Sequence, residues 1–243
     1  MKDHQLAARL ATQAGDLLLA VREEFVDATQ AERKSAGDSR SHEFLMEALT
    51  EARPADKVLS EEGADDRRRL QAERVWIVDP LDGTREFSEL GRPDWAVHVA
   101  LWEAGELAAG AVALPAQGLT LATPDVAAPP ANAGPARIVV SRTRPPAIAL
   151  RVREQLDGTL VEMGSAGAKV AAVVQGLADV YVHAGGQYEW DSAAPVAVAR
   201  AAGLHTSRID GSSLQYNRAD SLLPDLLVCR PEHADAVLAA INS

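Results

Sequence analysis

The sequence contains a single cysteine, Cys229, which excludes an internal disulfide bond. Because this cysteine lies in the apolar run "DLLVC", we expect a small buried residue on a strand. No apolar run approaches the roughly 20 residues that a membrane-spanning helix requires. The first residues, "MKDHQ", lead directly into an amphipathic helical pattern without the features of a signal peptide. We therefore expect a cytoplasmic protein with no membrane partner.

Aromatic residues make up only 4% of the 243 residues, so aliphatic side chains and alanine must supply most of the core. Basic residues are also in the minority: 24 Lys and Arg stand against 35 Asp and Glu, which gives a formal net charge of −11 at pH 7. Binding to a nucleic-acid backbone needs clustered Lys and Arg, so no nucleic-acid partner is expected. If the substrate is an anion, bound cations are the expected means of attracting it.

The spacing of apolar residues predicts a mixed fold. Repeats of three and four from Leu6 to Phe25 predict a long first helix, and "RSHEFLMEALTEARP" (40–54) predicts a second, ended by Pro54. Strands are predicted in "KVLSEEG" and "RVWIVDP", and "DWAVHVALWEAGELAAGAVALP" predicts two strands joined at Ala104–Gly105. Helices and strands continue to alternate along the chain, which indicates an α/β class with helices layered on sheets.

The stretch "PDVAAPPANAGPA", residues 124–136, has the Pro, Ala and Gly content of a linker or surface loop. It divides the chain into two fused halves, residues 1–130 and residues 131–243. The first half contains most of the acidic motifs described below. We expect the second half to complete the site and to bind the substrate.

Acidic residues stand in pairs at three separate places, each at the end of an apolar strand-like run or the start of a helix. The pairs are Glu61 and Glu62 in "SEEG", Asp79 and Asp82 in "DPLD", and Glu189 and Asp191 in "EWD". Like charges that converge raise each other's pKa, and a hard cation such as Mg²⁺, which prefers oxygen ligands, removes the conflict. Cys and His are absent at ligand spacing, which argues against zinc. One pair alone is an ordinary cap or solvated turn, whereas three together favour a metal site.

The local sequence "DPLDGT" is suited to such a site. Pro80 stiffens the turn, and the three-residue spacing lets Asp79 and Asp82 face one point together with the Leu81 carbonyl. Gly83 permits a sharp entry into a following helix, whose free N–H groups would point into the same pocket. A metal ion beside a helix N-terminus predicts a phosphate site.

These motifs resemble those of the inositol-monophosphatase-like superfamily of metal-dependent, lithium-sensitive phosphatases, over nearly the whole chain. "LSEEG" is similar to the family's Glu-Glu element, "WIVDPLDGTREF" to its central motif and "WDSAAPVAVARAAG" to its C-terminal motif. The ending "GTREF", with "DWAVHVALW" and "VVSRTRPP", resembles the CysQ-type 3′(2′),5′-bisphosphate nucleotidases. The resemblance implies a layered αβαβα sugar-phosphatase-like fold, with two sheets and with helices between and outside them.

The resemblance also implies an activity. It implies a magnesium-dependent phosphatase, with two or three Mg²⁺ ions per site, that removes the 3′-phosphate of 3′-phosphoadenosine 5′-phosphate (PAP), or of its sulfated relative PAPS, in sulfur assimilation. The alternative is an inositol monophosphatase or fructose-1,6-bisphosphatase of the same superfamily. A non-catalytic sensor of phosphorylated ligands is disfavoured, because such a protein is expected to lose metal ligands. The oligomeric state stays open, with a homodimer as one expectation.

The resemblance assigns roles to particular residues. The implied metal ligands are Glu61, Asp79, the Leu81 carbonyl, Asp82 and Asp191. The implied catalytic groups are Thr84 and Asp38, which orient the attacking water, and Glu62 behind the ions. Asp38 aligns with a family element before the second helix, in which Ser35-Ala36-Gly37 replaces the usual threonine. The implied substrate contacts are Gly83, Thr84, Ser141, Arg142, Ser165, Lys169, His183 and Glu189, with Arg144 joining Ser141 and Arg142 at the 5′-phosphate.

Other signals are weaker. "GSAG" is not the nucleophile elbow of a serine hydrolase, and no nucleotide-binding glycine loop occurs. "DDRRRL", residues 65–70, predicts a solvated helix face. The histidines without partners at ligand spacing are predicted to be structural; they are His4, His42, His98, His205 and His233.

Overall fold

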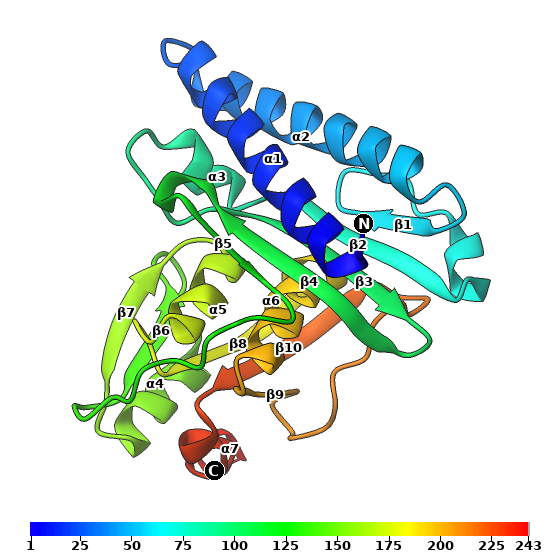
Figure 1. The fold of residues 1–243 in the computed structure, drawn as a ribbon. Coiled ribbons are helices and arrows are strands. Elements are labelled where there is room, and N and C mark those ends of the chain that lie inside the picture. The colour runs from blue at the N-terminus through cyan, green and yellow to red at the C-terminus, as the bar shows by residue number, and fades with distance from the viewer. Residues whose placement is uncertain (243) are drawn as a thin grey trace.

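The computed structural model describes residues 1–242. Its helices and sheets form five layers (Figure 1). In order, the layers are the helices α1 (Asp3–Glu24) and α2 (Gln30–Ala52), a first sheet, the helices α5 (Ala166–Val174) and α6 (Glu189–Ala201), a second sheet, and the helices α4 (Ala147–Gln155) and α7 (Ala234–Asn242). The predicted αβαβα arrangement is confirmed.

The first sheet has the strand order β1-β2-β3-β4-β5. Its strands are β1 (Lys57–Ser60), β2 (Arg74–Asp82), β3 (Ala96–Glu103), β4 (Glu106–Leu114) and β5 (Leu119–Ala122). β1 runs parallel to β2, and the other neighbours are antiparallel. Trp76 and Val78 of β2 pack on α1 and α2, whereas Val75 and Ile77 face the central helices. Helices therefore cover both faces of the sheet, which explains the unbroken apolar run "VWIV".

The second sheet has the strand order β7-β6-β8-β10-β9. Its strands are β6 (Arg137–Ser141), β7 (Thr159–Met163), β8 (Val180–Tyr188), β9 (His205–Ser207) and β10 (Leu222–Cys229). Tyr181 of β8 faces the central helices, and its neighbours Val180 and Val182 pack toward α4 and α7. Cys229 is buried on β10, as predicted. The short strands β5, β7 and β9 were not predicted; they are the outermost strands of their sheets.

All strands of the first sheet lie between residues 57 and 122, and all strands of the second lie between 137 and 229. Residues 124–136 between them form neither helix nor strand. The central helix α6 nevertheless packs on β3 and β4 of the first sheet, so both halves share one hydrophobic core.

The second helix corrects one prediction. It begins at Gln30 rather than at residue 40. Thr29 caps it: the Thr29 hydroxyl accepts the N–H of Glu32 at 3.2 Å, and the Glu32 carboxylate accepts the N–H of Thr29 at 2.9 Å. This reciprocal pair is a capping box, and "TQAE" is its sequence signature. Asp38 therefore lies inside α2 and not before it.

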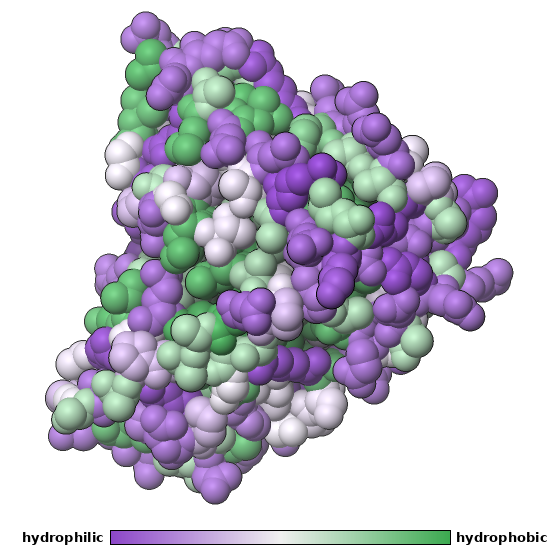
Figure 2. Space-filling model, viewed as in Figure 1, coloured by the Kyte–Doolittle hydropathy of each residue, from purple (hydrophilic) through white to green (hydrophobic). Residues whose placement is uncertain are grey.

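Within residues 1–242 no helix is both long and apolar enough to cross a bilayer. The exposed large hydrophobic side chains come from separate elements; they include Val26, Leu90, Leu150, Leu177 and Leu222. Hydrophilic and hydrophobic residues are accordingly interspersed on the face shown in Figure 2.

Candidate metal and phosphate site

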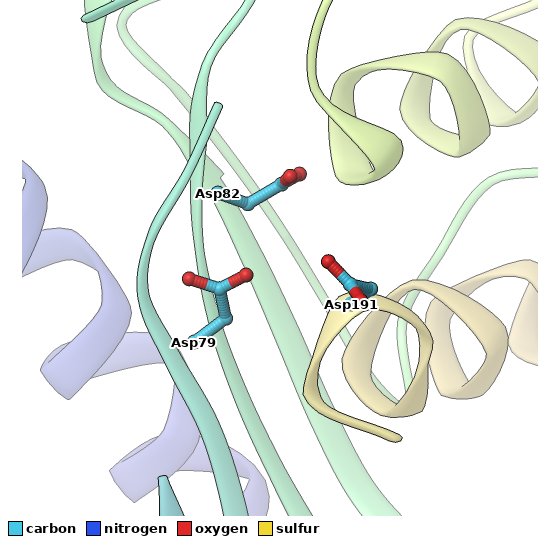
Figure 3. A group of neighbouring side chains, drawn as sticks. All are labelled: Asp79, Asp82 and Asp191. Carbon is cyan, nitrogen blue, oxygen red and sulfur yellow. The ribbon is translucent and has the colours of Figure 1, made fainter. Parts of the chain in front are cut away.

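Asp79 and Asp82 lie at the C-terminal end of β2 and share one side of the strand (Figure 3). Residues three apart on a regular strand face opposite sides. Here Asp79 pairs with His98 and Asp82 pairs with Ala96, so β2 has one residue more than β3 between the two pairs. This extra residue makes a β-bulge, and the bulge turns both carboxylates toward the same space.

The first turn of α6 adds a third carboxylate, that of Asp191 (Figure 3). One oxygen from each of Asp79, Asp82 and Asp191 lies within 4.8 Å of the others, in the one such acidic group found among the described residues. Glu61 and Glu62 follow β1 and are exposed as whole residues, but the carboxyl group of Glu61 is turned in toward the buried Asp79. Glu61 hydrogen-bonds to Asp79 through its side chain, so this predicted ligand stands at the edge of the group.

Two carboxyl groups of this cluster, and that of the neighbouring Glu61, have raised pKa values. Burial, and next the charge of Glu61, raise the pKa of Asp79 well above its ordinary value. Burial and the charge of Asp82 raise the pKa of Asp191 to about 6. Burial and the charge of Asp191 raise the pKa of Glu61 to about 7. An oxygen-only set of converging carboxylates fits a hard divalent cation, which relieves their repulsion.

Asp82 behaves differently because it accepts hydrogen bonds from the start of α5. Its carboxylate accepts the N–H of Ala166 at 3.1 Å, the N–H of Gly167 at 2.6 Å, and the hydroxyl of Ser165. Burial favours its neutral form, but the charge and hydrogen bond of His98, the hydroxyl of Ser165 and the charge of Lys169 outweigh burial and lower the pKa of Asp82 to about 2. The N-terminus of α5 therefore supplies the positive end of a helix dipole to the cluster.

The sequence had pointed to a different helix. Gly83 adopts a left-handed conformation, with a φ of 83°, which permits the predicted sharp entry into a helix. The helix that follows it, α3 (Thr84–Ser88), is only a single short turn. The prediction that this helix directs free N–H groups at the site stays a prediction, and α5 adds a second helix N-terminus beside the cluster.

His98 is a site residue that the sequence did not reveal. Its ring is fully buried, with Nε2 at 3.2 Å from Oδ2 of Asp82 and Nδ1 at 3.1 Å from the carbonyl oxygen of Trp190. The prediction that it is only structural overlooked this contact. His98 meets the cluster through the register of β2 and β3, which ligand spacing along the chain does not reflect.

Thr84 and Asp38 lie side by side, as the resemblance implied. The Thr84 hydroxyl oxygen is 3.4 Å from Oδ1 of Asp38. Burial, and next the charge of Glu62, raise the pKa of Asp38 to about 6. α2 approaches closely because Gly37 has no side chain: a Cβ there would lie 2.6 Å from the ring of Phe87.

A cavity of about 320 Å³ adjoins Asp82 and Asp191. Six of the predicted substrate-binding residues line it: Gly83, Ser141, Arg142, Ser165, Lys169 and His183. Arg85 and Arg144 add two further cationic side chains to its wall. A larger depression, of about 660 Å³, lies between residues 208 and 224 and contains none of these groups. The cavity beside the carboxylates therefore differs from the larger depression in combining cationic walls with the acidic cluster.

Two of the lining residues are held by backbone oxygens. Lys169 is buried, and its ammonium group donates to the carbonyl oxygens of Gly164 and, at 2.7 Å, of Ser165. Burial lowers the pKa of Lys169. Nε2 of His183 lies 3.3 Å from the carbonyl oxygen of Gly186. Both side chains are thereby fixed at the wall of the cavity.

Arg142 is engaged by carboxylates. Its Nε donates to Glu86 at 2.8 Å, and its Nη2 donates to Glu89 at 2.8 Å. The two contacts tie the end of β6, in the second half of the chain, to α3 in the first. Arg144 is exposed at the rim of the same cavity.

The family model of the inositol monophosphatase family matches residues 3–128 and 131–243. The chain belongs to this family. Inositol monophosphatase II of Staphylococcus aureus has the same fold, with a TM-score of 0.82 over 99% of this chain and 96% of its own, at 19% sequence identity. The CysQ structure from Bacteroides thetaiotaomicron has a TM-score of 0.77 at 25% identity, covering 94% of this chain and 97% of its own.

Two curated proteins are similar to this chain over most of their length. A protein of Mycobacterium leprae named 3′-phosphoadenosine 5′-phosphate phosphatase is 51% identical, across 100% of this chain and 94% of its own length. The 3′(2′),5′-bisphosphate nucleotidase CysQ of Escherichia coli strain K12 is 31% identical, across 88% of this chain and 94% of its own length. Both similarities extend over the motifs that form the acidic cluster.

Glu189 and Thr84 are the predicted substrate contacts that do not line the cavity. Glu189 is almost fully buried, and its two carboxylate oxygens accept the N–H groups of Asn217 and Arg218, each at 2.7 Å. Because these oxygens already hold the segment that leads to β10, Glu189 is not proposed as a substrate contact.

The prediction for the stretch "DDRRRL" is corrected at one residue. It forms part of the short 3₁₀ helix η1 (Arg67–Gln71), in which Arg67 and Arg68 are exposed. Arg69 is fully buried, so the prediction of a solvated face is wrong for this residue. No local pattern signals this burial, because two of the acceptors of Arg69, on Asn217 and Arg218, are remote in the chain.

Proposed function

We propose that this protein is a magnesium-dependent phosphatase that removes the 3′-phosphate of PAP, or of PAPS, in sulfur assimilation. Membership of the inositol monophosphatase family supports the reaction class. The names of the mycobacterial and CysQ relatives support a nucleoside bisphosphate as the substrate. The single observation that carries the proposal is the convergence of Asp79, Asp82 and Asp191 at the mouth of a cavity with cationic walls.

The residues that would hold Mg²⁺ are Glu61, Asp79, the Leu81 carbonyl, Asp82 and Asp191. Two or three ions per site are proposed. Mg²⁺ bound there would balance the acidic charge, lower the pKa of a water molecule and stabilise negative charge on the phosphoryl group.

The chain supplies the groups that position and deprotonate the water. The Thr84 hydroxyl lies between two oxygens, at 3.4 Å from Oδ1 of Asp38 and 3.2 Å from the Leu81 carbonyl. We propose that Thr84 orients the water and that Asp38 receives its proton. The pKa of Asp38, raised to about 6 by burial and by Glu62, suits a base near neutral pH. Glu62 therefore acts by tuning Asp38, or as a ligand for a third ion.

The cavity supplies the contacts to the rest of the substrate. Gly83, Thr84 and Ser165 lie next to the cluster and are proposed to face the 3′-phosphate. Ser141, Arg142 and Arg144 are proposed to hold the 5′-phosphate, with Lys169 and His183 near the sugar or base. Arg142 is already paired with two glutamates, so a bound phosphate would share or replace these partners. The charge-assisted bonds of arginine to phosphate favour such an exchange.

The proposal is tested by phosphate release from PAP, PAPS, inositol 1-phosphate and fructose-1,6-bisphosphate, measured side by side with Mg²⁺ and with EDTA. We expect PAP or PAPS to give the highest kcat/KM, and EDTA to abolish turnover. Asp82→Asn tests the proposed metal ligands. We expect its turnover to be at least about 100-fold lower and its circular dichroism spectrum to remain that of a folded protein. A higher kcat/KM for inositol 1-phosphate or fructose-1,6-bisphosphate would contradict PAP or PAPS as the preferred substrate. Undiminished turnover in EDTA would contradict the dependence on Mg²⁺. Lithium inhibition, a cytoplasmic location and a homodimer stay predictions of the sequence.

A further inference from the structure

Arg69 joins two segments that are remote in the sequence. Its guanidinium donates to Asp65 through Nε at 2.6 Å and through Nη2 at 3.1 Å. Nη1 donates to Oδ1 of Asn217 at 2.7 Å, and Nη2 also donates to the carbonyl of Arg218 at 2.9 Å. A fully buried guanidinium is tolerated only when it is paired and hydrogen-bonded. Arg69 thus ties the segment after β1 to the segment before β10.

The second segment is tied in turn to α6. Asn217 and Arg218 donate consecutive backbone N–H groups to the carboxylate of Glu189. Asn217 has a φ of 57°, in the left-handed region, a conformation that lets neighbouring N–H groups converge on an anion. Glu189 is the first residue of α6, and Asp191 is in the same turn, where it accepts the N–H of Tyr188 at 2.6 Å.

The first segment leads to the same cluster from the other side. Asp65 lies in the loop that follows β1 and begins with Glu61. Glu61 hydrogen-bonds to Asp79, and it lies near enough to Asp191 for their charges to interact. Two connections therefore lead from Arg69 to the acidic cluster. One passes through the loop that begins with Glu61, and the other passes through the segment before β10 to the first turn of α6.

We propose that Arg69 is a positioning residue of the metal site, which fixes the Glu61 loop relative to the first turn of α6. This inference rests on the proposed metal-dependent function. The ladder and bulge of β2 hold Asp79 and Asp82 in place. Glu61 and Asp191 lie on a loop and on a helix start, and Arg69 connects these two elements. The separation of Glu61 and Asp191 is therefore what Arg69 controls.

Arg69→Lys tests this role because it keeps the charge but loses the planar fork that reaches several acceptors at once. We expect the affinity for Mg²⁺ in the absence of substrate, measured by isothermal titration calorimetry, to fall about 10-fold. The turnover number at saturating Mg²⁺ stays close to that of the wild type, because every proposed ligand is still present. This split between metal affinity and turnover is the signature of positioning.

Arg230→Lys is the matched control. Arg230 is also buried, at 4% exposure, and it donates to Asp179 at 2.6 Å beside the second sheet. We expect a comparable loss of thermal stability in this variant, with unchanged Mg²⁺ affinity. Asn217→Gly is a second test: glycine tolerates the φ of 57° and keeps the N–H to Glu189, but it removes the side chain that Arg69 contacts. We expect it to lower Mg²⁺ affinity too.

The outcomes separate the inference from the proposed function. If the wild type binds Mg²⁺ and hydrolyses PAP, but Arg69→Lys and Asn217→Gly bind Mg²⁺ as tightly as Arg230→Lys, the positioning role is overturned and the function stands. If the wild type neither binds Mg²⁺ nor hydrolyses a phosphate monoester, both are overturned. If Arg69→Lys does not fold, the affinity of Asn217→Gly decides between a positioning role and a structural one.

Discussion

Nε2 of His98 lies 3.2 Å from Oδ2 of Asp82, a member of the acidic cluster, and both side chains are buried. The two residues come from neighbouring strands, and the register of those strands also places Nδ1 of His98 3.9 Å from Asp79. His98 is thus a potential countercharge held against two of the proposed metal ligands. The start of α5 covers it, with Gly167 directly against the ring.

Gly167→Ala tests this close packing. Glycine to alanine inside a helix ordinarily stabilises a protein by up to about 1 kcal/mol. Here the new Cβ would lie 1.9 Å from Nε2 of His98 and 3.0 Å from Oδ2 of Asp82. We expect the free energy of unfolding to fall by about 1–3 kcal/mol, with a loss of turnover because Asp82 is displaced. Denaturant titration measures the first effect and phosphate release the second.

Gly134→Ala is the control for this substitution. Its new Cβ would meet only Oδ1 of Asn132, at 3.4 Å, in the irregular segment between the sheets. We expect a change of less than about 0.5 kcal/mol. Stabilisation of the protein by Gly167→Ala would contradict the packing described for His98.

Thr84 and Asp38 are expected to act as one unit. Thr84→Ala removes the hydroxyl that orients the water, and Asp38→Asn removes the group that receives its proton. Either substitution alone should lower the turnover number by about 100-fold or more, and the double variant should be little worse than either single variant. Steady-state kinetics of the four proteins at saturating Mg²⁺ measure this cycle. Fully multiplied losses would show that the two residues act independently.

The proposed metal ligands predict a pH dependence. The pKa of Glu61 is raised from 4.5 to about 7, mainly by burial, and the pKa of Asp191 from 3.8 to about 6. The folded, metal-free protein therefore binds more protons than the unfolded chain between about pH 4 and pH 7. As the pH rises through that window, ionisation of these groups lowers the free energy of unfolding. Bound Mg²⁺ needs the deprotonated forms, so it should reverse this loss.

Thermal unfolding with EDTA and with Mg²⁺ measures this effect. The increase in midpoint that Mg²⁺ produces should be larger at about pH 7.5 than at about pH 5, because protons compete with the metal at the lower pH. Taking the difference between the two conditions cancels groups that do not contact the metal. An increase that is equal at both pH values would contradict metal binding by these carboxylates.

Arg142→Ala separates two roles of one side chain. If Arg142 holds the 5′-phosphate, the KM for PAP should rise by about 10- to 100-fold, the value of one to two charge-assisted hydrogen bonds. The KM for adenosine 3′-monophosphate, which has no 5′-phosphate, should stay unchanged. Arg153→Ala, an exposed position on α4, is the control. Equal losses with both substrates would mean that Arg142 only ties α3 to β6.

Local patterns allowed the mixed class, with helices layered on sheets, and the acidic motifs to be predicted, whereas the αβαβα arrangement was implied by the family resemblance. The apolar run before Asp79 marks a strand covered on both faces, and the motif from Trp76 to Phe87 is contiguous. The start of α2 was missed because the capping box at Thr29 precedes a polar stretch without an apolar stripe. The strands β5, β7 and β9 were missed because each is short and only partly buried.

Residues whose partners are remote could not be assigned. Asn217, to which Arg69 donates, is 148 residues away in the sequence, and no local pattern distinguishes Arg69 from its exposed neighbours. Glu189 stands beside a proposed metal ligand, which suggested a contact with substrate, but its acceptor oxygens are used by a segment 28 residues later. His98 reaches Asp82 only through the pairing of two strands. These assignments require the tertiary structure.

The bulge in β2 has a consequence for how this segment tolerates change. Because one extra residue brings Asp79 and Asp82 to a common side, a further residue added to the strand between them would turn one carboxylate toward the hydrophobic layer. Losing one residue would instead remove the bulge, and residues two apart on a regular strand face the same side. The segment between the two aspartates should therefore be more sensitive to an insertion than to a deletion.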